Sequence, residues 1–191
     1  IIKAQHPEFE IWNEGVHASA GVSCADCHMP YQREGSYKVS NHQIQSPLLN
    51  VNASCGTCHN DSEEVLTDRV VKIQDNFMHS RDVAMDALMV YIDNLETART
   101  DGTPAEDLAL AQSYHQAAQF YIDYVYSENG FGFHADQYMM RILNDAQYFI
   151  LQGELALEGG EVGTVADFLR SQGVRVELDE PEAEAAANGE G

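Results

Sequence analysis

The sequence has 191 residues, of which 44% are hydrophobic, and this is enough for one domain with a buried core. Its formal net charge of -21 argues against binding to nucleic acid or to anionic lipid, because both require Lys and Arg. No stretch approaches the roughly 18–20 continuous apolar residues of a membrane span. The chain starts without Met and without a signal peptide, so we interpret it as a mature or truncated piece of a longer precursor.

Residues 1–60 are expected to form a loop-rich segment with short helices only, because Gly and Pro interrupt this part of the chain repeatedly. The interrupting residues are Pro7, Gly15, Gly21, Pro30, Gly35, Pro47 and Gly56. No alternation of apolar and polar residues is long enough to predict a β-strand here or elsewhere.

Residues 61–175 are expected to form long antiparallel helices. Between Asp61 and Asp101 there is neither Gly nor Pro, and apolar side chains recur at helical spacing. This apolar stripe consists of Val70, Ile73, Phe77, Ala84, Leu88, Tyr91, Leu95 and Ala98. We therefore predict one long helix that ends at Asp101-Gly102.

A second helix is predicted to begin with a capping box, in which Thr103 is the N-cap, Pro104 the first helical residue and Glu106 the reciprocal partner. Its inward face is expected to consist of Leu108, Ala111, His115, Ala118, Ile122 and Val125. Further helices are predicted at about 135–158 and 164–171. Residues 176–191, with six acids and no base, are predicted to be a disordered tail.

All four cysteines fall in two CxxCH motifs, Cys24-Ala25-Asp26-Cys27-His28 and Cys55-Gly56-Thr57-Cys58-His59. In such a motif two thiols reach the vinyl groups on one edge of a porphyrin, and the following His lies under the iron. The sequence therefore predicts two covalently attached c-type haems, with His28 and His59 as the proximal ligands.

The alternative for these cysteines is a zinc site built from two CxxC pairs. The interval of 27 residues between Cys27 and Cys55 is longer than usual for such a site, and two adjacent histidines would be a coincidence. A thioredoxin-like CxxC would require a βαβ context that is absent. Because thioether attachment depends on export-linked maturation, we expect an extracytoplasmic, periplasmic location.

Each iron has a sixth position, and the histidines left to fill it are His6, His17, His42, His79, His115 and His134. Spacing alone does not select among them. His17 is too close to Cys24 to serve that haem easily, and His134 follows a flexible glycine-containing turn. His115 and His79 are expected to be core or interface histidines, and the methionines are expected to be core residues.

The order of these features resembles the second half of the pentahaem cytochrome c nitrite reductases over roughly residues 1–160. The resemblance rests on Lys3-Ala4-Gln5-His6-Pro7-Glu8, His17, Cys24-Ala25-Asp26-Cys27-His28-Met29-Pro30, His42, Ser46-Pro47-Leu48-Leu49-Asn50, Cys55-Gly56-Thr57-Cys58-His59 and Gly132-Phe133-His134. It implies a mainly α multihaem cytochrome c, in which a loop-rich haem-binding front half is followed by long antiparallel helices.

The resemblance also implies roles for the remaining histidines. The first motif corresponds to the fourth haem of the family, with His134 as its distal ligand. The second motif corresponds to the fifth haem, with His17 as its distal ligand. His42 is similar to the distal ligand of a second haem, whose own motif would lie upstream of this chain.

Two further roles are implied near the start of the chain. Lys3, through its carbonyl, and Gln5, through its side chain, match calcium ligands beside the family's active site. His6 matches the active-site histidine over the catalytic haem, and the following Pro7 is expected to hold His6 in an extended conformation.

The family reduces nitrite to ammonium, which implies nitrite as the substrate and an electron-donor cytochrome or quinol dehydrogenase as a partner. It also implies a homodimer packed through the long helices, with Ala84, Leu88, Tyr91 and Leu95 partly buried between subunits. The family's CxxCK motif and three of its five haem sites have no counterpart here. We therefore expect a C-terminal fragment that could not turn over alone.

Two alternatives stay open. One is a fragment of the octahaem nitrite reductases, whose final portion is similar. The other is a non-catalytic multihaem electron-transfer cytochrome, in which every haem would be six-coordinate and His6 would have no role. The upstream sequence would separate them through its number of CxxCH motifs and the presence of CxxCK.

Overall fold

The structure, a computed structural model, describes residues 3–176 and is mainly α, as the sequence predicts. The predicted acidic tail lies outside the described residues, apart from its first residue. The elements are α1 (Glu8–Asn13), α2 (Val16–Ser19), α3 (Cys24–His28), β1 (Tyr31–Glu34), β2 (Tyr37–Ser40), the 3₁₀ turn η1 (Pro47–Leu49), α4 (Val51–Ser54), α5 (Glu63–Asp101), α6 (Ala105–Tyr126), α7 (Asp136–Leu157) and α8 (Val165–Ser171).

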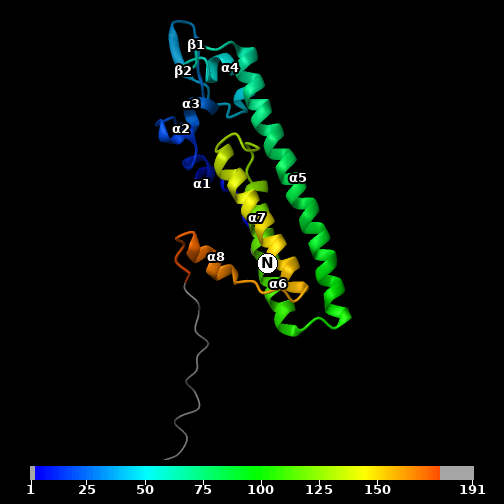
Figure 1. Ribbon diagram of the computed structural model, residues 1–191. Coiled ribbons are helices and arrows are strands. Elements are labelled where there is room, and N and C mark those ends of the chain that lie inside the picture. The colour runs from blue at the N-terminus through cyan, green and yellow to red at the C-terminus, as the bar shows by residue number, and fades with distance from the viewer. Residues whose placement is uncertain (1–2, 177–191) are drawn as a thin grey trace, which may run out of the picture.

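Helix α5 is the element that joins the two parts of the molecule. It begins at the N-cap Ser62, whose hydroxyl accepts from the N–H of Val65, and it ends at Gly102, which takes the left-handed conformation at φ 93°. At 1.5 Å per residue its 39 residues span roughly 58 Å. Its first turns lie beside α4, and its later turns pack with α6 and α7 (Figure 1).

The core lies between α5, α6 and α7, and its largest fully buried side chains include Tyr91, Tyr114 and Phe149. The Tyr91 hydroxyl donates to the carbonyl of Ala111 at 2.6 Å. A Cβ at Gly153 would meet that hydroxyl oxygen at 1.7 Å, so only glycine lets α7 approach α5 this closely.

The predicted long-helix stripe is confirmed, but its expected place between subunits is wrong. Ala84 and Tyr91 are 0% exposed, Leu95 is 5% exposed and Leu88 is 8% exposed within this one chain. Residues of α6 and α7 cover them, and together these three helices form the core of this chain. Any contact with a second copy would involve other residues.

The predicted capping box at Thr103 is also wrong. Pro104 is the N-cap of α6, with ψ 140°, and no side chain caps the helix. Asp101 accepts hydrogen bonds from both the backbone N–H and the hydroxyl of Thr103, at 3.1 and 2.8 Å. The Thr103 hydroxyl is thereby held by the preceding helix, and α6 begins at Ala105.

A β-hairpin is present that the sequence pattern did not predict. Strands β1 and β2 pair antiparallel, with Tyr31 opposite Ser40 and Glu34 opposite Tyr37. The two-residue turn between them uses Gly35 at φ 63°. The four residues of β1 are all exposed, so no apolar face produces the alternation on which strand prediction depends.

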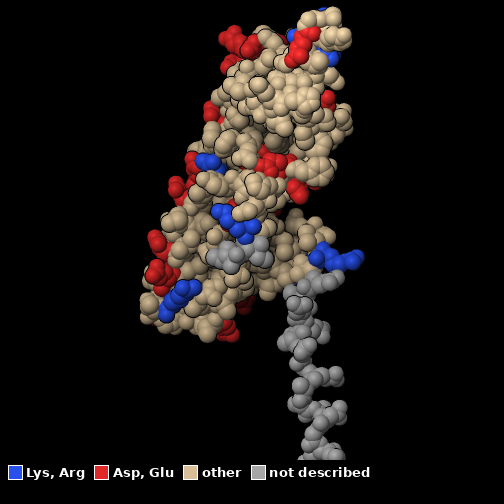
Figure 2. All heavy atoms as spheres, turned by 180° about the vertical axis from the view of Figure 1, so that it is seen from behind, with Lys and Arg blue, Asp and Glu red and all other residues tan. Residues whose placement is uncertain are grey.

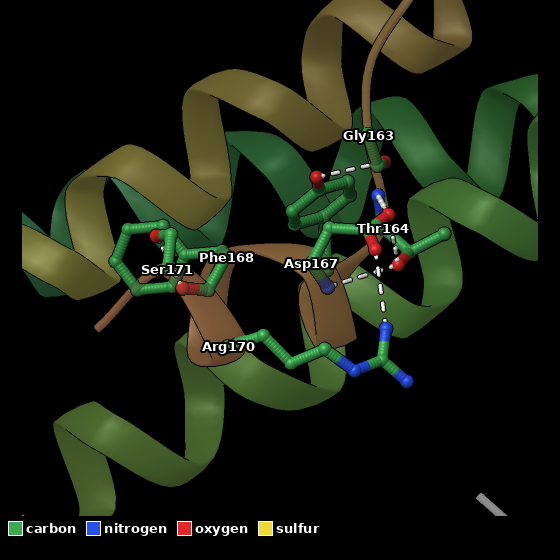
Figure 3. Close-up of polar contacts among 7 residues, drawn as sticks. Gly163, Thr164, Asp167, Phe168, Arg170 and Ser171 are labelled. Atoms are coloured by element: carbon green, nitrogen blue, oxygen red, sulfur yellow. Dashed lines mark hydrogen bonds and ion pairs between the residues drawn. The ribbon is translucent and has the colours of Figure 1, made fainter. Parts of the chain in front are cut away.

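The predicted short helix after residue 164 is confirmed as α8. Thr164 and Asp167 form its capping box, and Arg170 pairs with Asp167 at 3.2 Å (Figure 3). The Tyr114 hydroxyl donates to the carbonyl of Gly163 at 3.0 Å, and the Phe168 ring packs on Phe149 with centroids 4.9 Å apart. Together these contacts hold α8 against the core.

Acidic side chains are scattered over the face shown in Figure 2, with few basic ones between them. Among the described helices, none combines the length and the apolar character needed to cross a bilayer.

Candidate functional site

The first CxxCH motif forms one short helix, α3. Its N-cap Ser23 and Asp26 make a capping box, with the Ser23 N–H donating to the Asp26 carboxylate at 2.7 Å. These hydrogen bonds with Ser23 lower the pKa of Asp26. Because residues three apart share one face of a helix, Cys24 and Cys27 lie on the same side, and His28 follows directly.

The second motif also takes one helical turn, immediately after α4. The N–H groups of Cys58 and His59 donate to the Cys55 carbonyl at 3.1 and 2.9 Å. A Cβ at Gly56 would meet the carbonyl oxygen of Asn52 at 2.6 Å, which explains why glycine follows the first cysteine. Both motifs thus wind through about one helical turn, the first as a regular helix and the second as a hydrogen-bonded turn.

The two motifs are adjacent. The Ser54 hydroxyl, from the last residue of α4, donates to the Cys27 carbonyl at 2.9 Å. Burial raises the pKa of Cys27 and of Cys55, and the neighbouring thiols add to the shift at Cys27. All four cysteines are free. In each motif one cysteine is exposed and the other is half-buried, so both thiol pairs are at the surface of this segment.

His28 faces His134, which lies between α6 and α7. Their ring centroids are 6.3 Å apart and their planes make an angle of 56°. Nδ1 of His28 lies 2.9 Å from the Gln45 carbonyl, which can only accept a hydrogen bond, so Nδ1 carries the proton and Nε2 keeps its lone pair. Nδ1 of His134 is bonded to the carboxylate of Glu128.

His59 faces His17 of α2 at the same separation. These ring centroids are also 6.3 Å apart, with an interplanar angle of 81°. Burial, followed by the nearby His59 and His134, lowers the pKa of His17. A Cβ at Gly15 would meet the His134 carbonyl oxygen at 2.0 Å, so glycine permits α2 to lie directly against the segment that carries His134.

Both separations suit two imidazoles on opposite sides of one metal ion. A histidine nitrogen lies about 2 Å from a metal that it ligates, so two such rings have centroids roughly 6 Å apart. The Nδ1 contacts of His28 and His134 leave their Nε2 atoms available, as is usual for ligating histidines. Within residues 3–176, no three His, Cys, Asp or Glu side chains are gathered so that they could hold a metal ion by themselves.

The other histidines lie apart from these two pairs. His42 is exposed after β2, and its Nδ1 donates to the Ser40 carbonyl at 2.8 Å. Its Nε2 atom is therefore not used by this hydrogen bond. His115 is half-buried beside Tyr91 in the helical core, as expected, and its Nε2 is buried without a hydrogen-bond partner. His79, which was expected to be a core or interface histidine, is exposed on α5 and so does not lie in the core of this chain.

The segment before α1 carries Lys3, Gln5 and His6, all exposed. The expected extended conformation of His6 is wrong, because its φ is 55°, in the left-handed region. The chain turns here directly into α1, and the turn is fixed because the Ser127 hydroxyl donates to the Ala4 carbonyl at 2.9 Å. Such backbone strain costs about 1–3 kcal/mol and persists only where the surroundings impose it.

Glu128 is a residue of the site that sequence reasoning missed. It is 1% exposed and is bonded to His134. An acid at a helix end is ordinarily assigned to solvent, so its residue type alone gave no signal. Its position directly before the glycine-containing turn that leads to a candidate ligand could have identified it.

Comparisons with known proteins place the chain among the cytochromes c. The family model for cytochrome c552 matches residues 1–189. A cytochrome c-552 of Bacteroides fragilis is 40% identical over 157 residues, which is 82% of this chain and 32% of that protein. A cytochrome c-552 of Maridesulfovibrio salexigens is 37% identical over 158 residues, covering 83% and 31%. The chain thus spans about a third of the length of these curated relatives.

Among solved structures, the chain is similar to a cytochrome c nitrite reductase of Desulfovibrio desulfuricans, whose catalytic subunit has two calcium sites. The TM-score is 0.79 at 28% sequence identity, covering 93% of this chain and 37% of that one. The outer cell wall cytochrome OcwA is similar in fold alone, with a TM-score of 0.56 at 21% identity over 78% of this chain and 30% of that one.

Proposed function

The chain belongs to the cytochrome c552 family, and on this premise we propose that it is the C-terminal part of a periplasmic multihaem nitrite reductase that reduces nitrite to ammonium. The observation that carries the proposal is the pairing of histidines: His17 with His59, and His28 with His134, each with centroids 6.3 Å apart. The similarity to a nitrite reductase structure supports the same reading.

In this proposal the four cysteines would bind two haems c covalently, and the two histidine pairs would hold their irons. His28 and His134 serve the first motif, and His59 and His17 serve the second. When bound, such haems pass single electrons. The protein's contribution is to close the sixth position of both irons, so that they relay electrons and bind no substrate. His42, with a free Nε2, is proposed to ligate a haem attached outside this chain.

Nitrite binding is proposed to involve His6, next to a haem supplied by the rest of the protein. An exposed imidazole can donate a hydrogen bond to the anion and pass protons to its departing oxygens. The left-handed backbone of His6 supports a functional reason for its placement. Calcium, held by the Lys3 carbonyl and the Gln5 side chain, would fix the same segment.

The net reaction sets what the protein must supply. Nitrite, eight protons and six electrons give one ammonium ion and two waters. Since each haem carries one electron at a time, several must lie close together. The two motifs in this chain meet that need, because Ser54, directly before the second motif, is hydrogen bonded to Cys27 of the first. An electron-donor cytochrome or a quinol dehydrogenase is proposed as the source of electrons.

A homodimer is proposed to form on the outer face of the long helices. Val83 and Val90 lie seven residues apart on α5, so they share a face, and they are 47% and 59% exposed. Leu151 of α7 is 58% exposed. In this proposal these exposed apolar side chains would be covered by the second copy.

A second candidate is a non-catalytic electron-transfer cytochrome. The same two histidine pairs favour it, because a chain whose irons are both six-coordinate carries electrons without binding substrate. The two functions differ in whether the complete protein contains an open haem beside His6.

The deciding experiment uses the full-length, haem-loaded protein with a reduced viologen dye as donor. The proposal predicts one ammonium formed per nitrite consumed, with six dye electrons used. If the dye oxidises while nitrite is unchanged, the electron-transfer function is correct instead. Release of nitric oxide as the product would also contradict the proposal.

A further inference from the structure

Glu128 is a fully enclosed carboxylate next to one of the two histidine pairs. Its side chain is 0% exposed, and it accepts a hydrogen bond from Nδ1 of His134 at 2.5 Å. It also accepts hydrogen bonds from the N–H groups of Gly130 and Gly132, at 2.6 and 3.4 Å. A buried carboxylate is costly unless donors surround it, so these three contacts define one stable orientation.

We propose that Glu128 is a positioning residue that fixes His134 as an axial ligand and lowers the reduction potential of the haem bound at Cys24 and Cys27. This inference rests on the haem ligation proposed above. Because a carboxylate accepts from Nδ1, the proton stays on Nδ1, and Nε2 keeps its lone pair for an iron ion.

The local sequence is shaped around this pair. A Cβ at Gly130 would lie 2.7 Å from Oε1 of Glu128 and 2.8 Å from Nδ1 of His134, so any side chain there would push the two apart. The Gln74 side chain of α5 donates to the Gly130 carbonyl at 3.1 Å and holds the turn in place.

The same turn contains two consecutive residues with left-handed backbone, Phe131 at φ 52° and Gly132 at φ 91°. A Cβ at Gly132 would meet Cβ of Phe77 at 2.7 Å, so the turn is packed against α5 as well. This conformation points the N–H groups of Gly130 and Gly132 at Glu128, and the strain at Phe131 is explained if the orientation of the carboxylate matters.

The two ligands of this haem then have different partners. His28 donates to a neutral carbonyl of Gln45, whereas His134 donates to a negative charge. A carboxylate partner makes an imidazole a stronger donor to iron, and a nearby negative charge favours the ferric over the ferrous state. Both effects lower the potential of the haem.

The test is Glu128→Gln in the full-length holoprotein, followed by a spectroelectrochemical titration of the haems. The haem in question is identified as the one whose low-spin electron paramagnetic resonance signal is lost in His134→Ala. We expect the ferric/ferrous equilibrium of that haem to move about tenfold toward the ferrous form, the scale of a lost outer-sphere partner. For one electron this corresponds to about 59 mV. The low-spin signal is expected to stay.

Glu8→Gln is the matched control. Glu8 accepts a hydrogen bond from Asn129 of the same turn at 2.5 Å but is not hydrogen bonded to a histidine. It should leave the potential of this haem unchanged. Gly130→Ala is a second test that keeps the charge but displaces the pair, and it should alter the signal of the same haem while sparing the haem at Cys55 and Cys58.

An unchanged potential in Glu128→Gln, with the low-spin signal intact, would overturn the inference and leave the proposed ligation standing. A general loss of helicity and of all low-spin signals would mean that Glu128 is required for folding. This result would also overturn the inference that it tunes one haem. If the wild-type protein itself has no low-spin haem that depends on His134, the proposed ligation fails as well.

Discussion

The imidazole rings of His17 and His59 lie with their centroids 6.3 Å apart and their planes at 81°, although one comes from α2 and the other from the end of the second CxxCH motif. The second pair, His28 and His134, repeats the separation. One histidine of each pair follows the cysteines of its own motif, so the fold must position the other histidine, His17 or His134. The backbone at Gly15 lies directly against that of His134, which brings α2 and the turn before His134 together.

The first prediction concerns His6. In the full-length enzyme, His6→Asn should reduce nitrite turnover by roughly 10²-fold, the usual scale for a lost acid–base group. The haem spectrum should stay nearly unchanged, because His6 is proposed to face substrate without ligating iron. Turnover close to that of wild type would remove His6 from the mechanism, and a lost low-spin signal would make it an axial ligand.

The second prediction concerns assembly. Val90→Glu places a charge on the exposed face of α5, where the dimer is proposed to form. Both subunits of a symmetric dimer would carry this charge at the interface. Burying a valine contributes about 1.5–3 kcal/mol, so dissociation should become at least about tenfold easier, measured by sedimentation equilibrium of the full-length protein. Val174→Glu, at a residue 48% exposed beyond α8, is the control and should leave the mass unchanged. Equal masses for both variants would place the dimer contact elsewhere.

The third prediction concerns the pH dependence of stability. Burial, followed by the charge of Arg99, lowers the pKa of His115 from 6.5. The unfolded chain therefore takes up a proton as the pH falls through 6.5, whereas the folded chain resists it, so acidification costs stability. Above that pH the penalty is absent.

His115→Phe keeps the contact with Tyr91 and removes both the titrating group and the unpartnered Nε2. Chemical denaturation at pH 7.5 and at pH 5.5 should show that the variant gains stability relative to wild type at the lower pH. A constant difference between the two proteins would mean that His115 is protonated equally well in both states.

The features that the sequence predicted are those set by periodicity and by covalent chemistry. The stripe that includes Tyr91 and Leu95 was sufficient to predict α5, because a 39-residue helix repeats its pattern many times. The short helix predicted at 164–171 is present as α8, and the capping box of Thr164 and Asp167 that starts it is formed by residues close in sequence. The two CxxCH motifs were identified because their spacing is fixed by the porphyrin.

The features that it did not predict depend on contacts between distant residues or on competition between neighbours. The hairpin at β1 and β2 has no buried face, so its strands carry no alternation. Thr103 was predicted to form a capping box with Glu106, but its hydroxyl donates to Asp101 instead. The left-handed backbone of His6 arises from packing of the chain start. The burial of Glu128 arises from packing of the turn before His134, and its residue type alone did not indicate it.

The account depends most directly on whether His17 and His134 ligate iron. The decisive measurement is near-infrared magnetic circular dichroism of the ferric full-length holoprotein, which reports the axial ligands of each low-spin haem. We predict that His17→Ala and His134→Ala each remove the bis-histidine contribution of one haem, and that the double variant removes both. Unchanged spectra in the single variants would contradict the account, because both irons would then have other sixth ligands.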